Sequence, residues 1–151
     1  MAGIVHDIGK IQVPEAILTK PVRLTEVEYL VLRRHSQAGH DILMDIVFPW
    51  PIADMVLQHH ERLYGSAFPQ GLYQDQIILG ARILAVADVV EAMGLDRPYR
   101  VGLGLEAALA EIHRGRGRIY DPQAADTCVV LLSRAGAGVL LWRGPAQPVS
   151  V

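Results

Sequence analysis

Charged and imidazole side chains interrupt the apolar faces of several expected helices. Asp88 has three small or apolar neighbours one helical turn away, Leu84, Ala85 and Ala92. An ionised carboxylate on such a face must pair with a cation or bind a metal, because burying it bare costs more free energy than a small domain can supply. The chain must therefore fold so that other charged or metal-binding groups reach this position.

The apolar residues recur at helical spacing along most of the chain, without the strict alternation of strands. Thr25 and Glu28 form a capping-box pattern, and Pro122 suits the first position of a helix. Residues 4–9 resemble the end of a helix, and the further expected helices are 25–46, 52–63, 75–94, 105–115 and 121–134. The sequence therefore predicts an all-α fold of about five to six helices.

Composition narrows the class of protein. The chain has 151 residues, 51% of them hydrophobic and 20% charged, which is typical of one ordered domain. A net charge of −2 gives no basic surface for binding nucleic acid, and a single cysteine, Cys128, excludes an internal disulfide framework.

The apolar tract 128–142 is too short to span a bilayer and contains Arg134, so we expect a cytoplasmic protein. We expect the domain to occupy 1–135, followed by a Gly/Pro-containing tail, 136–151.

Histidines also fall on apolar faces. His35 lies in a stripe with Val31 and Ala38, whereas His40 falls on the opposite face, where we expect it to be solvated. Taken alone, His35 is equally typical of a core histidine that is hydrogen-bonded to a backbone carbonyl. Its interpretation as a ligand therefore depends on the other candidates.

Two adjacent histidines, His59 and His60, point about 100° apart if both are helical. Adjacent histidines are usually surface groups, but here each shares its helical face mainly with apolar residues, His59 with Val56 and Leu63, and His60 with Ala53 and Leu57. Both point away from four side chains that we expect to be solvated: Asp54, Gln58, Glu61 and Arg62.

The segment "IVHDIGK" adds His6 and Asp7 between apolar residues. The alternative for this dipeptide is a helix end with a capping aspartate, and the alternative for Asp88 is an ion pair with Arg82 or Arg97. Taken together, six groups form a nitrogen and oxygen ligand set: His6, Asp7, His35, His59, His60 and Asp88. Imidazole and carboxylate without thiolate suit iron, manganese or zinc, and six groups are too many for one four-coordinate ion. A two-metal hydrolytic site that polarises a phosphoryl oxygen fits this count.

Five blocks, in order, carry a resemblance to a known family. They are "HDIGKIQVPEAILTKP", "RRHSQAGHDIL", "WPIADMVLQHHERLYGSAFPQGL", "ARILAVADVVEAMGLDRPYR" and "RIYDP", within residues 4–122. The chain resembles the HD-GYP family, a branch of the HD superfamily of metal-dependent phosphohydrolases. The resemblance implies an HD-domain helical bundle. The family's first helices have no counterpart in residues 1–5, so we expect a domain truncated at its N-terminus, with two ions rather than three.

The resemblance also implies an activity. The family hydrolyses cyclic di-GMP, a bacterial second messenger, to the linear dinucleotide and in some members to GMP. Two divalent ions, iron or manganese, would be held by the six groups above, and His6, Asp7 and Lys10 would be the catalytic residues. Lys10, Arg97 and Arg100 would bind the substrate, since Arg suits bidentate contact with phosphate or guanine. An exposed loop with solvated charges is the alternative for "RPYR".

The chain departs from the family pattern "HHERxDGxGYPxGL", because Tyr64, Ala67 and Phe68 replace Asp, Gly and Tyr. Ala67 would be strained if its φ had to be positive. These changes favour a second hypothesis, a catalytically weakened module that binds cyclic di-GMP or another protein. A third is a different HD phosphohydrolase acting on nucleotides. The resemblance further implies receiver or GGDEF domains as partners, and apolar surface exposed by truncation favours a homo-oligomer.

Overall fold

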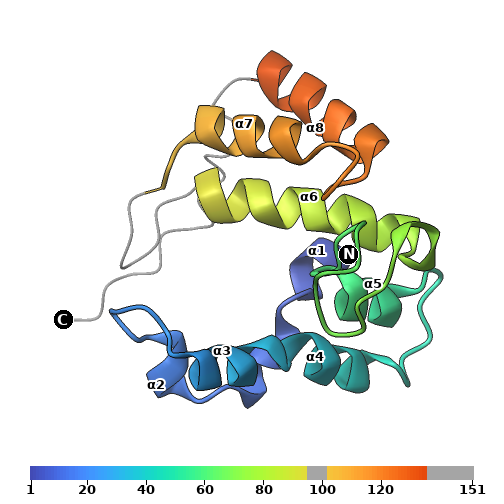
Figure 1. The fold of residues 1–151 in the computed structure, drawn as a ribbon. Coiled ribbons are helices and arrows are strands. Elements are labelled where there is room, and N and C mark those ends of the chain that lie inside the picture. Colours follow the sequence, from blue (N-terminus) through green and yellow to red (C-terminus); the bar gives the residue numbers. More distant parts are fainter. Residues whose placement is uncertain (95–101, 136–151) are drawn as a thin grey trace.

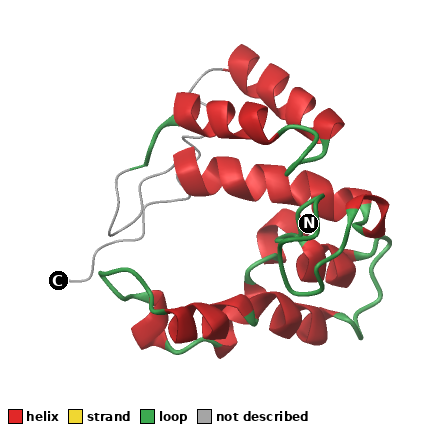
Figure 2. Ribbon diagram, in the orientation of Figure 1, coloured by secondary structure: helices red, strands yellow, loops and turns green. Residues whose placement is uncertain are grey.

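The computed structural model describes residues 1–94 and 102–135, and none of these residues forms a β-strand. The prediction of an all-α fold is confirmed (Figure 2). The elements are α1 (Ala2–Val5), the 3₁₀ helix η1 (Ile8–Gln12), α2 (Glu15–Leu18), α3 (Glu26–Arg33), α4 (His35–Leu43), α5 (Ile52–Gln58), the 3₁₀ helix η2 (Gln74–Gln76), α6 (Leu79–Gly94), α7 (Leu105–Gly115) and α8 (Pro122–Ala135). Within the described residues, no helix combines the length and apolar character needed to cross a bilayer.

The expected helices 25–46 and 52–63 are interrupted or shortened in the structure. The segment 25–46 is divided into α3 and α4, because the Arg34 amide bonds to the Val31 carbonyl (3.2 Å), which tightens the last turn of α3. The predicted capping box at the start of α3 is confirmed. The segment 52–63 is helical only to Gln58, where the Glu61 amide bonds to the Gln58 carbonyl (2.9 Å) and the chain turns.

Helix α6 separates two groups of helices (Figure 1). On one side lie α7 and α8, and the buried core there includes Val86, Val90, Ala108, Ile112 and Ala125. On the other side α6 contacts α1 and α5. A smaller core joins α4 and α5 through the buried side chains of Leu43, Ile52 and Val56. Because α6 borders both groups, a polar side chain on it can face residues from the first half of the chain.

A close approach of two backbones positions the N-terminal histidine and aspartate. Gly9 of η1 lies against α4, where an added Cβ would be 2.0 Å from the His35 carbonyl oxygen and 2.5 Å from the Gly39 nitrogen. Any larger residue at position 9 would push η1 away from α4. Glycine therefore brings the segment that carries His6 and Asp7 next to His35.

Candidate metal centre

Five of the six predicted ligand side chains form a closed ring of contacts. Asp7 lies between two imidazoles, with its carboxylate 3.4 Å from His6 Nε2 and 3.4 Å from His35 Nε2. Asp88 likewise lies 3.6 Å from His6 Nε2 and 4.0 Å from His60 Nδ1. The ring closes where His35 Nε2 and His60 Nε2 approach to 3.2 Å. Groups that are up to 82 residues apart in the sequence (88 − 6) thus face one common centre.

The sixth side chain, His59, lies beside this ring. Its imidazole centroid is 3.9 Å from that of His60, 5.3 Å from that of His6 and 5.5 Å from that of His35. Ligand atoms of His35, His59 and His60 all lie within 4.8 Å of one another. The structure therefore brings all six predicted residues together, from the turn between α1 and η1, from α4, from the turn after α5, and from α6.

Three of the histidines are held by the same local contact. The Nδ1–H of His6, His35 and His59 donates to the carbonyl oxygen three residues earlier, at 2.9, 2.7 and 2.6 Å respectively. This bond fixes the ring orientation and leaves Nε2 as the atom with a free lone pair, which is the usual arrangement for a metal-binding histidine. The alternative interpretation of His35, a core histidine bonded to a backbone carbonyl, therefore holds for Nδ1. The same bond turns Nε2 of His35 toward Asp7 and His60.

His59 provides the test of fit to a metal. Its side chain is fully buried, and its Nε2 has no hydrogen-bond partner among the described residues. A buried polar atom without a partner costs free energy, so native proteins rarely leave one. A metal ion would satisfy this atom, and the oxygen and nitrogen donors around it suit iron, manganese or zinc. The residues present therefore fit a metal centre.

The electrostatics of the cluster favour neutral imidazoles at His35, His59 and His60 beside an ionised Asp88. Burial lowers the pKa of His59 to about 4 and also lowers the pKa of His35 and of His60. Burial opposes ionisation of Asp88, but contact with His6 and the nearby imidazoles holds its carboxyl pKa below the usual range. The pKa of His6 is raised, mainly by contact with Asp88. Neutral imidazole and carboxylate are the forms that bind metal.

The structure also decides one sequence alternative and corrects one expectation. Arg82 does not pair with Asp88, because its guanidinium bonds to Asp121 (2.9 Å). Arg97, the other proposed partner, and Arg100 lie outside the described residues, as does the expected tail, 136–151. His40 was expected to be solvated but is partly buried, and its two nitrogens lie 3.3 Å from Asp41 and 3.8 Å from Asp54.

A cavity of about 430 Å³ opens onto the centre. Four of the predicted ligands line it, namely Asp7, His35, His60 and Asp88, together with Lys10. The Lys10 ammonium lies 2.5 Å from the Asp7 carboxylate. A cation is therefore already present where an anionic substrate would meet the centre.

One wall of this cavity is a loop held by a residue that the sequence analysis placed in solvent. Glu61 is 2% exposed, so that expectation was wrong. Its carboxylate accepts hydrogen bonds from the backbone amides of Gln70 (2.6 Å), Gly71 (3.1 Å) and Leu72 (3.1 Å). These charge-assisted bonds satisfy the buried carboxylate and fix the loop over the cavity.

Two of the three substituted positions, Ala67 and Phe68, fit into this loop without strain. Among the described non-glycine residues, positive φ occurs at Gln74, so Ala67 does not adopt the conformation that would have penalised it. Phe68 packs on His60, with ring centroids 4.8 Å apart. It also contacts Arg33, a cavity-lining residue that the sequence analysis did not single out, although Arg33 follows Tyr29 by one helical turn in the same block as His35.

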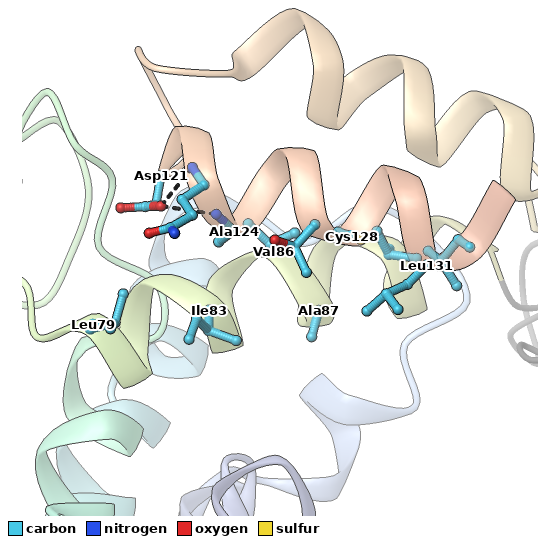
Figure 3. Close-up of a pocket in the computed structure, with 12 residues that line it drawn as sticks. Leu79, Ile83, Val86, Ala87, Asp121, Ala124, Cys128 and Leu131 are labelled. Atoms are coloured by element: carbon cyan, nitrogen blue, oxygen red, sulfur yellow. Dashed lines mark hydrogen bonds between the residues drawn. The ribbon is translucent and has the colours of Figure 1, made fainter. Parts of the chain in front are cut away.

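A larger cavity, of about 630 Å³, lies elsewhere, between α6 and α8 (Figure 3). Its labelled side chains include Leu79, Ile83 and Ala87 on α6, and Cys128 and Leu131 on α8. None of the six clustered histidines and aspartates lines it. Its lining is mainly apolar, and its one carboxylate, Asp121, is bonded to Arg82, so we place the chemistry in the smaller cavity.

A helical fold that gathers histidines and aspartates at one centre is typical of metal-dependent proteins. Comparison with known proteins identifies the family. The HD domain family matches residues 1–124. The chain therefore belongs to the HD domain family, whose members are metal-dependent, and the predicted resemblance to its HD-GYP branch is confirmed.

Three relatives illustrate the similarity. The chain is 44% identical over 128 residues to the cyclic di-GMP phosphodiesterase response regulator RpfG of Xanthomonas campestris pv. campestris, covering 83% of the chain and 34% of that protein. It is 44% identical over 124 residues to cyclic di-GMP phosphodiesterase PA4108 of Pseudomonas aeruginosa (82% and 30%). It is 42% identical over 133 residues to 3′3′-cGAMP-specific phosphodiesterase 1 of Vibrio cholerae (85% and 30%). The chain thus spans about a third of the length of these relatives.

Proposed function

We propose that this chain is a metal-dependent phosphodiesterase that hydrolyses cyclic di-GMP to the linear dinucleotide, and onward to GMP. The observation that carries the proposal is the convergence of His6, Asp7, His35, His59, His60 and Asp88 on one centre beside a cavity. The names of the three relatives support the reaction class, since each is a cyclic dinucleotide phosphodiesterase.

We propose two divalent cations, iron or manganese, as the cofactors, with these six side chains as their ligands. The number of donor groups supports two ions, because a single tetrahedral ion uses four. When bound, such cations polarise phosphoryl oxygens and lower the pKa of coordinated water. The protein contributes the fixed ring orientations, which it sets through the Nδ1 bonds of His6, His35 and His59.

Lys10 has a separate task in this proposal. Its ammonium lies beside Asp7 at the edge of the cavity, within reach of a phosphoryl oxygen of a bound diester. There it would donate a hydrogen bond that orients the phosphate and strengthens as negative charge develops on it. We assign Arg97 and Arg100 to the substrate on the basis of the "RPYR" block.

The test is turnover by the full chain loaded with manganese or iron. We expect cyclic di-GMP to be converted to the linear dinucleotide, as measured by anion-exchange chromatography, and expect removal of the metal by a chelator to stop the reaction. Asp7→Ala should also abolish turnover. A folded, metal-loaded sample that forms no linear product would overturn the proposal. That result would favour the second hypothesis, a binding or interaction module, which the substitutions in the loop at 64–68 support.

The regulatory context is part of the same proposal. One relative is named as a response regulator, so we propose that this domain works in the cytoplasm under the control of a receiver or GGDEF domain. Comparing turnover by the chain alone with turnover in the presence of such a domain tests this, and an unchanged rate would contradict it.

A further inference from the structure

Arg33 occupies an unusual position in the cavity beside the metal centre. Its guanidinium carbon lies 4.6 Å from the ring centroid of Tyr29 and 4.6 Å from that of Phe68. All three residues line the cavity. Contact with two aromatic rings holds a guanidinium by cation–π attraction and restricts the orientation of its plane.

Among the described residues, this guanidinium has no hydrogen-bond acceptor, and its Nε is buried without a partner. By contrast, Arg62 in the same cavity donates to the carbonyl oxygens of His59 (3.2 Å) and Glu61 (2.9 Å). A positioned guanidinium with free donors in a cavity is prepared to bind an acceptor-rich ligand group.

We propose that Arg33 is a specificity-determining residue that binds the O6 and N7 atoms of a guanine base. Guanine presents two adjacent acceptors on that edge, which match the paired donors of arginine, whereas adenine presents a donor, N6, in place of O6. The residue therefore favours guanine over adenine nucleotides. The choice of a cyclic dinucleotide as the source of the base rests on the proposed function.

The position of Arg33 favours a base over a phosphate. The Lys10 ammonium and the clustered histidines already provide a phosphate-binding region in this cavity. Arg33 instead contacts two aromatic rings, and Phe68 belongs to the loop that Glu61 holds. A volume of about 430 Å³ is within the usual range of small-molecule sites, so one nucleotide can contact both regions.

Binding of mononucleotides to the manganese-loaded chain tests this inference, because these ligands contain no diester to be hydrolysed. Isothermal titration would measure the dissociation constants of GMP, AMP and inosine monophosphate, which keeps O6 and N7 but lacks the 2-amino group. We expect GMP and inosine monophosphate to bind with similar affinity, and both at least about fivefold more tightly than AMP. Arg33→Gln should abolish this preference, since glutamine pairs with adenine on the same edge.

Arg34→Gln is the matched control, because Arg34 is the exposed neighbour, and it should leave all three affinities unchanged. Arg33→Lys keeps the charge but not the planar donor pair, so it should lose the guanine preference without losing overall affinity. An equal loss of all three ligands in Arg33→Gln would show a phosphate contact and overturn the inference. Weak binding of inosine monophosphate, or no binding of any nucleotide, would overturn it as well.

The inference and the proposed function fail separately. Guanine-selective binding that depends on Arg33, without hydrolysis of cyclic di-GMP, would overturn the function and leave the inference intact. Hydrolysis of cyclic di-GMP, together with a nucleotide preference that Arg33→Gln does not change, would overturn the inference and leave the proposed function intact.

Discussion

Two cavities on either side of α6 have opposite chemistry. The larger one, toward α8, is lined mainly by apolar side chains, and its one carboxylate, Asp121, bonds to Arg82 and to the amides of Gln123 and Ala124. The smaller one contains Asp88, whose neighbours are imidazoles rather than an arginine. Both carboxylates are largely buried, but their partners differ in kind.

From this difference we infer that Asp121 is a structural acid, whereas Asp88 belongs to the proposed metal centre. Asp121 has its charge neutralised and its oxygens satisfied within the protein, so it needs nothing from outside. Asp88 instead lies among imidazoles, and one of the clustered histidines, His59, has a buried nitrogen without a partner among the described residues. The volume of a cavity is therefore a poorer guide to function here than the unsatisfied groups on its wall.

The largest effect should come from removing Asp88. We expect Asp88→Ala to weaken metal binding by more than about 100-fold, because losing a ligand exceeds the 10–100-fold effect of losing an outer partner. Metal content per chain, measured by mass spectrometry after dialysis, would show it. Asp41→Ala, which removes an exposed aspartate, should keep full metal content. Equal metal content in both variants would mean that Asp88 is not a ligand.

Asp121→Ala should lower the stability of the fold and leave metal binding unchanged. It leaves Arg82 without its main partner and removes the acceptor for two amides at the start of α8, so we expect a loss of about 3 kcal/mol in the free energy of unfolding. Urea denaturation would measure this loss. Metal content should stay at the wild-type value, and its loss would show that the two sides of α6 are not independent.

Glu61→Gln tests the loop that closes the smaller cavity. The amide keeps one acceptor oxygen but brings an NH₂ group toward backbone amides that are donors themselves. We expect a loss of about 2 kcal/mol in stability, retained metal and a higher KM. Glu15→Gln, at an exposed position, should change neither property. An unchanged KM would show that the loop does not shape the substrate site.

The smallest effect should come from the start of α3, the helix that carries Tyr29 and Arg33. Thr25 caps this helix by accepting from the Glu28 amide (3.3 Å). Thr25→Ala should cost about 1 kcal/mol of stability without changing metal content. Thermal unfolding followed by circular dichroism would measure it, and a cost near zero would show that packing alone fixes α3.

The sequence predicted the helical fold and its buried polar groups because both follow from local patterns. Helical spacing located α6 and α7 closely, and the apolar surroundings of Asp88 required partners before their identity was known. The close approach at Gly9 and the break between α3 and α4 were not predicted. Both depend on packing between segments, and such packing produces no periodic pattern in the sequence.

Glu61 and Arg33 show why parts of the site escaped prediction. Glu61 reads as a solvated residue beside Arg62, since its partners are backbone amides that have no sequence signature. Arg33 depends on two rings, of which Phe68 is 35 residues away (68 − 33) and is brought near by the loop. Both are long-range contacts of groups whose residue type alone suggests solvent.

Anomalous diffraction from crystals grown with manganese or iron would test the central claim most directly. We expect two peaks between His6, Asp7, His35, His59, His60 and Asp88, each at about 2.0–2.2 Å from its nitrogen or oxygen ligands. Density without any peak at this centre, or a metal bound instead at His40, Asp41 and Asp54, would contradict the account.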